Sequence, residues 1–152
     1  MNVKQKKEAL FFSLHSIGAL LLGLVCYLCF RPDTWVSKCV YGFFGAEETP
    51  FNVGAVLPDW LTSFFCNFFS DMLWAYALTF TVFFFLGSRN DSCLLSFFIC
   101  AVFEIGMELL QNFSIISGTF DVWDIILELF STITAQFIIK VYFKEKHHEN
   151  KL

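Results

Sequence analysis

The sequence is poor in charge and in proline. Charged residues make up 16% of its 152 residues and only three residues are proline, whereas 57% are hydrophobic and 22 are phenylalanine. A soluble domain of this length cannot bury so much apolar surface. The composition therefore excludes a soluble globular domain and indicates a protein whose main solvent is lipid. Its size predicts a single domain over residues 1–152.

Several functional signatures are also missing. The sequence has no internal repeat, no low-complexity tract and no glycine-rich phosphate loop. No Ser-His-Asp or Cys-His arrangement can be assembled on one side of a membrane. Nothing indicates a nucleic-acid partner, no catalytic residue can be named, and whether the protein is an enzyme stays undecided.

Four long apolar segments are predicted to be membrane-spanning helices, since about 20 residues cross a ~30 Å hydrocarbon core. The run after the first three lysines exceeds the hydrophobic region of a signal peptide, so it is interpreted as a retained helix. The second segment is short, with Ser70 as its expected N-cap. Either Asn67–Phe69 extends it or the bilayer is thinned locally. The fold class is therefore an all-α, integral membrane four-helix bundle. The segments are Ala9–Phe30, about Asp71–Leu86, Cys93–Phe113 and Asp121–Phe143.

The connector between the first two segments, Arg31–Ser70, holds all three prolines yet remains rich in aromatic residues. Within it, Thr34–Phe44 and Asp59–Phe69 are predicted to be short interfacial or re-entrant helices. The later connectors, Gly87–Ser92 and Ser114–Phe120, are short. Helices two and three, and three and four, should therefore be antiparallel neighbours.

The basic residues predict the orientation. If the residues before helix one, the loop between helices two and three and the chain end are cytoplasmic, eight of the ten basic residues are inside. Only Arg31 and Lys38 are then outside. The prediction is a multi-pass plasma-membrane protein with both termini in the cytoplasm.

This topology brings polar residues of three helices to the outer half of the membrane. Glu104, Glu108 and Gln111 share one face of helix three. On helix four, the same spacing places four residues on one face: Asp121, Asp124, Glu128 and Thr132. Because an acid facing lipid is costly, these faces should point inward, toward each other or a wet cavity. The candidate polar pocket comprises Asp71, Glu104, Glu108, Gln111, Asp121, Asp124, Glu128 and Arg31.

Structural roles are alternatives for several of these residues. Asp121 and Asp71 suit helix capping, and Arg31 is either a counter-ion or a snorkelling anchor. So many carboxylates cannot all stay ionised without partners, so some would be protonated or bind a cation. With no histidine on the outer side, zinc is not expected. A carboxylate-only site would suit a divalent cation such as Ca²⁺, Mg²⁺ or Mn²⁺.

The polar pattern resembles that of VanZ-like membrane proteins. Glu108–Gln111 (ELLQ) followed by Gly118–Ile126 (GTFDVWDII) is similar to an E-x-x-Q helix end and the acidic turn that opens the next helix in that family. Asp71–Leu78 (DMLWAYAL) is similar to the opening of the family's preceding helix. The resemblance covers about Asp71–Phe143. The chain departs from the family at Thr119, where a basic residue is common.

The resemblance implies a bacterial cell-envelope protein associated with susceptibility to the lipoglycopeptide teicoplanin, an antibiotic-resistance role. Three functions remain open. The first is a binding protein whose outward-facing acidic pocket takes an amphiphilic or lipid-linked ligand, with membrane lipid as its surroundings. The second is a membrane enzyme acting on a lipid head group through Glu108 and Asp124. The third is an ion-coupled transporter, for which four helices are few unless the protein forms an oligomer.

Overall fold

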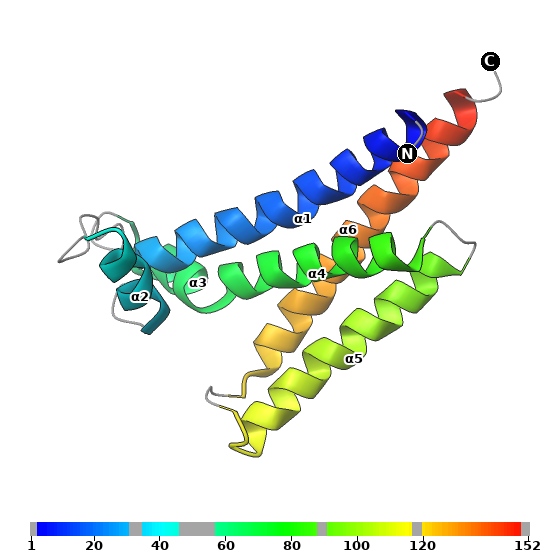
Figure 1. The fold of residues 1–152 in the computed structure, drawn as a ribbon. Coiled ribbons are helices and arrows are strands. Elements are labelled where there is room, and N and C mark those ends of the chain that lie inside the picture. The colour runs from blue at the N-terminus through cyan, green and yellow to red at the C-terminus, as the bar shows by residue number, and fades with distance from the viewer. Residues whose placement is uncertain (1–2, 31–34, 46–56, 88–90, 117–119, 150–152) are drawn as a thin grey trace.

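Four long helices make up the protein. Its computed structural model describes residues 3–30, 35–45, 57–87, 91–116 and 120–149, and these residues contain helices and turns but no strand. The all-α fold class predicted from the sequence is confirmed. The four long helices are α1 (Val3–Phe30), α4 (Ser70–Leu86), α5 (Ser92–Asn112) and α6 (Val122–Glu149), shown in Figure 1.

Each of these helices belongs to a stretch long and apolar enough to cross a membrane. The four stretches are Gln5–Phe30, Asp59–Leu86, Ser92–Asn112 and Val122–Lys144. Large apolar side chains cover the outside of the bundle: Leu14 is 68% exposed and Val102 is 70% exposed. In water such a surface would be an aggregation hazard, whereas in a bilayer it is ordinary. The architecture is that of a multi-pass integral membrane protein.

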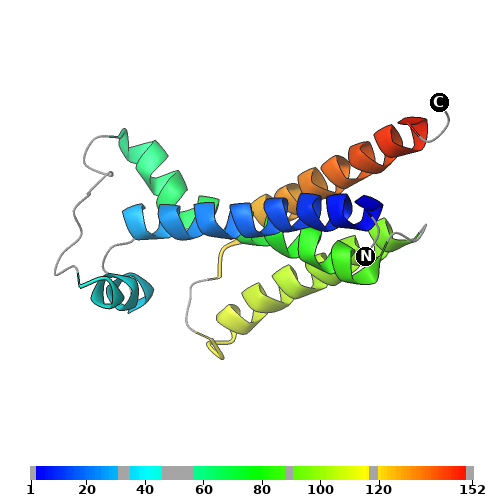
Figure 2. The same ribbon diagram turned by 45° about the horizontal axis from the view of Figure 1, so that its top comes forward.

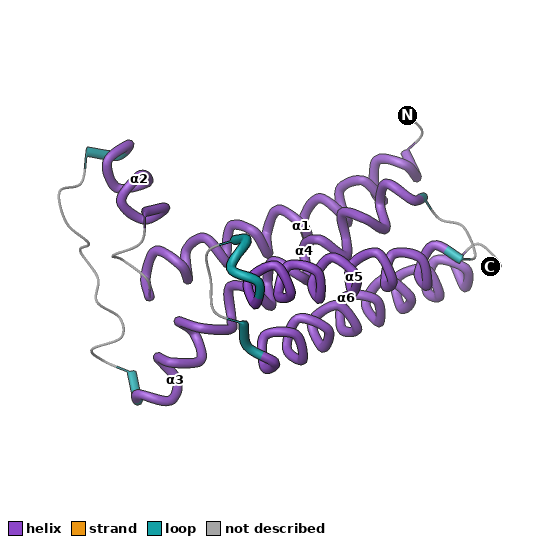
Figure 3. Tube along the Cα trace, turned by 90° about the horizontal axis from the view of Figure 1, so that it is seen from below, coloured by secondary structure: helices purple, strands orange, loops and turns teal. Residues whose placement is uncertain are grey.

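Helix α4 lies at the centre of the bundle and packs against α1, α5 and α6, and α5 also packs against α6. The predicted antiparallel pairs, α4 with α5 and α5 with α6, are thus neighbours. Figures 1 and 3 show the start of α1, the end of α4, the start of α5 and the end of α6 at one end of the bundle. This arrangement is the one that the distribution of basic residues predicts.

The core at the end of the bundle near the chain termini is built from aromatic rings and small residues. Phe12 of α1 stacks on Phe83 of α4 with ring centroids 5.5 Å apart, and Phe80 is fully buried beside them. Ala135 and Ile139 of α6 complete this cluster and have no exposed surface. Small residues at such contacts let helices approach closely, which drives helix association when lipid is as apolar as the core.

The second span differs from the prediction. Helix α3 (Asp59–Phe64) continues through a π-helical turn, η2 (Phe65–Phe69), into α4 without a break. The prediction of a separate interfacial or re-entrant helix at Asp59–Phe69 was therefore wrong. The expected cap at Ser70 was also wrong, since the helix starts after Pro58. No proline or glycine interrupts Asp59–Leu86, and a π-helical turn absorbs the change of axis direction seen in Figure 2.

Helix α2 (Trp35–Phe43) is the short helix predicted within Thr34–Phe44. It lies beside the end of α1, where the Tyr41 hydroxyl donates a hydrogen bond to the Leu28 carbonyl over 3.1 Å. Figures 1 and 2 show α2 outside the group of four long helices. Thr34 itself lies outside the described residues.

Candidate functional site

Five carboxylates from three helices gather in the half of the bundle away from the chain ends. Glu128 of α6 interacts electrostatically with Asp71 of α4, with Glu104 and Glu108 of α5, and with Asp124 of its own helix. These five residues are called the acidic cluster below. The sequence predicted inward faces for the members on α5 and α6, and Glu128 interacts with acids of both other helices. Like charges repel strongly in a medium of low dielectric constant.

Glu104 is the most deeply placed member of the acidic cluster on α5. Its side chain is 3% exposed, and its Oε1 accepts a hydrogen bond from the Thr132 hydroxyl over 2.6 Å. The Thr79 hydroxyl of α4 lies 3.3 Å from the Thr132 hydroxyl. Both threonines are fully buried. The three side chains therefore tie α4, α5 and α6 together through polar contacts inside an apolar bundle.

Glu108 joins the end of α5 to the start of α6. It is 4% exposed, and its Oε1 accepts a hydrogen bond from the Gln111 amide over 3.2 Å. Its Oε2 accepts one from the backbone N–H of Asp121 over 3.3 Å. A carboxylate that bonds a backbone N–H at a helix start also interacts favourably with the helix dipole. Glu108 thus fixes the helical hairpin as well as contributing charge.

Asp121 has the capping role that the sequence suggested. Its Oδ1 accepts a hydrogen bond from the backbone N–H of Trp123 over 2.9 Å, which satisfies one free donor at the start of α6. Asp71, in contrast, lies inside the continuous second span, so helix capping does not explain it. Arg31, the predicted counter-ion, lies outside the described residues.

Some carboxylate oxygens of the acidic cluster are buried without a hydrogen-bond partner, among them Oε2 of Glu104 and Oε2 of Glu128. A buried polar atom without a partner costs free energy, so most such atoms in proteins bond to protein, water or ligand. As carboxylate oxygens, these two atoms are hydrogen-bond acceptors.

The positions of the acidic side chains show whether they could coordinate the suggested divalent cation. Among the described residues, no three His, Cys, Asp or Glu side chains converge closely enough to hold a metal ion together. In this arrangement the acidic cluster therefore does not offer the several oxygen ligands that Ca²⁺ or Mg²⁺ requires from a protein site. Donor groups of an organic molecule fit the two unpartnered oxygens better.

The Thr132→Val variant tests the polar contact at the centre of the bundle. We expect it to lower the free energy of unfolding by about 1 kcal/mol, because Glu104 loses its only observed donor in a buried place. Thermal unfolding in detergent micelles measures this. Thr134→Val is the matched control, because Thr134 is partly exposed and bonds only to the Phe130 carbonyl of its own helix. Equal losses in the two variants would contradict the role assigned to Thr132.

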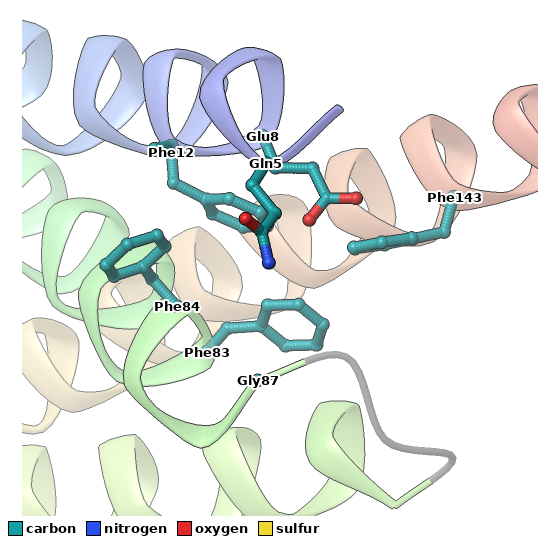
Figure 4. A pocket seen from close by; sticks show the side chains of 8 residues that line it. Gln5, Glu8, Phe12, Phe83, Phe84, Gly87 and Phe143 are labelled. Carbon is teal, nitrogen blue, oxygen red and sulfur yellow. The ribbon is translucent and has the colours of Figure 1, made fainter. Parts of the chain in front are cut away.

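The opposite end of the bundle has a separate cavity of about 320 Å³. Figure 4 shows its walls, which include Phe12 of α1, Phe83 and Phe84 of α4 and Phe143 of α6. Gln5 and Glu8 extend over it from the first turns of α1. None of the predicted site residues lines this cavity, so it is distinct from the acidic cluster.

The sequence analysis did not name several buried polar residues of the bundle interior, among them Thr79, Ser96 and Gln136. Their spacing was a usable signal. Gln136 lies four residues after Thr132, Ser96 lies eight residues before Glu104, and Thr79 lies eight residues after Asp71. All three therefore continue a helix face that carries a polar residue named from the sequence.

Comparison of the chain with protein-family models, with curated proteins and with solved structures finds no match.

Proposed function

We propose that this protein is a VanZ-like component of the bacterial cell envelope that binds an amphiphilic or lipid-linked ligand at the acidic cluster. It resides in the plasma membrane with both termini in the cytoplasm. Most basic residues belong to the regions that are then cytoplasmic: the residues before helix one, the loop between helices two and three, and the chain end. The acidic cluster then belongs to the outer half of the bilayer. A ligand reaches it from outside or from the outer leaflet.

One observation carries this proposal: the buried Oε2 of Glu128 has no hydrogen-bond partner although four other carboxylates surround it. A cluster serving only to hold helices together would be expected to have its oxygens satisfied from within, as Glu108 has. Acids in a membrane interior are expensive to maintain, and such residues are typically functional.

The negative charge of the acidic cluster favours ligands with hydrogen-bond donor groups over ligands with anionic groups. Phosphate oxygens would be repelled by the carboxylates, whereas ammonium, amide N–H and hydroxyl groups would donate to Glu104 and Glu128. The ligand therefore has an apolar part for the bilayer and a donor-rich part for the acidic cluster. A lipoglycopeptide has both parts, which makes a role in teicoplanin susceptibility consistent with this chemistry.

Binding to the purified protein in lipid nanodiscs tests the proposal, with teicoplanin and a polyprenyl-linked envelope intermediate as probes. Saturable binding is expected for the wild type. Glu104→Gln or Glu128→Gln should weaken it about tenfold or more, because each removes a carboxylate whose unpartnered oxygen would accept from the ligand, and loss of a charged acceptor costs about 1.5–3 kcal/mol. Asp91→Asn is the control, since Asp91 is exposed at the other end of the bundle.

Other outcomes would contradict the proposal. Binding that is unchanged in both variants would show that the acidic cluster does not bind the ligand. Turnover of the envelope intermediate that disappears in both variants would favour the membrane enzyme. Ion flux in proteoliposomes that disappears in them would favour the transporter.

A further inference from the structure

A groove lies between α5 and α6 near the chain-terminal end of the bundle, away from the acidic cluster. Its volume is about 440 Å³, within the range of about 300–1,000 Å³ typical of ligand sites. Phe97 of α5 and Ile133 and Phe137 of α6 are among its walls. Ile133 is 54% exposed and Phe137 is 66% exposed, so the groove opens on the surface that faces lipid.

One residue that lines this groove has a buried acceptor atom without a donor. Gln136 is 6% exposed, and its Nε2 donates a hydrogen bond to the Ser96 hydroxyl over 2.6 Å. The Ser96 hydroxyl in turn donates to the Cys93 carbonyl over 3.1 Å. These two bonds fix the orientation of the amide, yet its Oε1 is buried and has no partner. A hydroxyl or N–H group in the groove would satisfy it.

A positive charge stands one helical turn from this acceptor. Lys140 lines the same groove, is exposed, and follows Gln136 by four residues, about 6 Å along the helix axis. Its flexible side chain can extend toward the polar surface of the bilayer. An anionic group at the interface, with a hydroxyl about one turn deeper, therefore matches the two polar residues.

We propose that this groove binds a single-chain phospholipid, a lysophospholipid. Its phosphate pairs with Lys140, its free glycerol hydroxyl donates to Oε1 of Gln136, and its acyl chain lies along Phe97 and Ile133. An ordinary two-chain phospholipid has only ester oxygens at the depth of Gln136, so it would leave this acceptor unsatisfied. A monoacylglycerol has the hydroxyl but lacks the phosphate. The proposal is independent of what binds the acidic cluster.

Mass spectrometry of the intact protein released from detergent micelles tests this by counting bound lipid during titration. The probes are 1-oleoyl-glycerol-3-phosphate, its dioleoyl counterpart and monooleoylglycerol. We expect one bound lysophospholipid, with affinity about fivefold above the two-chain lipid for the hydroxyl bond and about tenfold above the monoacylglycerol for the phosphate contact. This comparison uses the unaltered protein and needs no variant.

Variants of Gln136 and Lys140 then test which side chain contacts which group of the lipid. Gln136→Met should remove the preference for one chain over two, and Lys140→Gln should weaken both phosphate-bearing lipids about tenfold while leaving monooleoylglycerol unchanged. Lys144→Gln is the control, because Lys144 is also exposed on α6 but does not line the groove. If Gln136→Met does not fold, the comparison of the three lipids and the Lys140→Gln variant still test the proposal.

The proposal is overturned if the three lipids bind equally, if none is retained, or if Lys140→Gln binds them as the wild type does. It is also overturned if the protein is a dimer that Phe137→Arg dissociates into a monomer without bound lipid. In that case a second copy of the chain occupies the groove.

Discussion

The Ala135→Leu variant should lose about 1–3 kcal/mol of unfolding free energy, because the larger side chain has no room between α6 and α4. Ala135 has no exposed surface and packs in the same cluster as Phe80 and Phe83. In a bilayer the added carbons gain nothing by burial, since lipid is equally apolar, so steric strain is not offset. Thermal unfolding in detergent micelles should show a clear fall in midpoint temperature.

Gly18→Leu is the control for this variant. It adds more volume than Ala135→Leu, but a side chain at Gly18 would meet no other atom within 4 Å, so it points into lipid. Its unfolding midpoint should stay close to that of the wild type. If Ala135→Leu were equally harmless, α4 and α6 would not pack closely at Ala135.

Glu128→Gln should act in the opposite direction and stabilise the protein by about 1–2 kcal/mol at neutral pH. Glu128 interacts electrostatically with four other carboxylates, and the amide keeps its shape while it cannot become negatively charged among them. The amide N–H₂ can also donate to the unpartnered Oε2 of Glu104. Ligand binding at the acidic cluster should weaken in the same variant, since functional residues are often retained at a cost in stability.

The measurement is thermal unfolding at pH 7 and at about pH 4, compared with Asp91→Asn, since Asp91 is exposed at the other end of the bundle. The gain should shrink in acid, where protonation of the wild-type carboxyls removes the repulsion, and the control should show little change at either pH. A Glu128→Gln protein that is less stable than the wild type at pH 7 would indicate that Glu128 has a favourable partner instead.

Much of the architecture follows from the sequence alone. Hydropathy and length predict four spans, and the basic residues place both chain ends and the loop between helices two and three on one side. The 3–4 spacing of Glu104, Glu108, Asp124 and Glu128 then predicts that acids of two helices meet, as they do. These features depend on local periodicity and on the cost of placing charge in lipid, so no tertiary contact is needed to derive them.

Hydropathy could not identify the start of the second span. Ser70 and Asp71 suggested a helix start, yet the helix is continuous from Asp59, because a π-helical turn keeps the chain helical while its axis changes direction. Whether polar residues interrupt a helix depends on what surrounds them. In this chain they lie within a helix that packs against α1.

Only the tertiary structure decided which apolar residues form the core. Phe80 is fully buried and Phe85 is 80% exposed, although both belong to the same phenylalanine-rich helix. In water the hydrophobic effect would favour burial of the apolar face of a helix. In a bilayer a phenyl ring gains little by moving from lipid to the protein interior, because both are apolar. Polar and small residues mark the interior instead: the face of α5 with the least exposure carries Ser92, Ser96, Cys100, Glu104 and Glu108 at intervals of four. Whether an apolar side chain is buried or faces lipid therefore depends on which helix packs beside it.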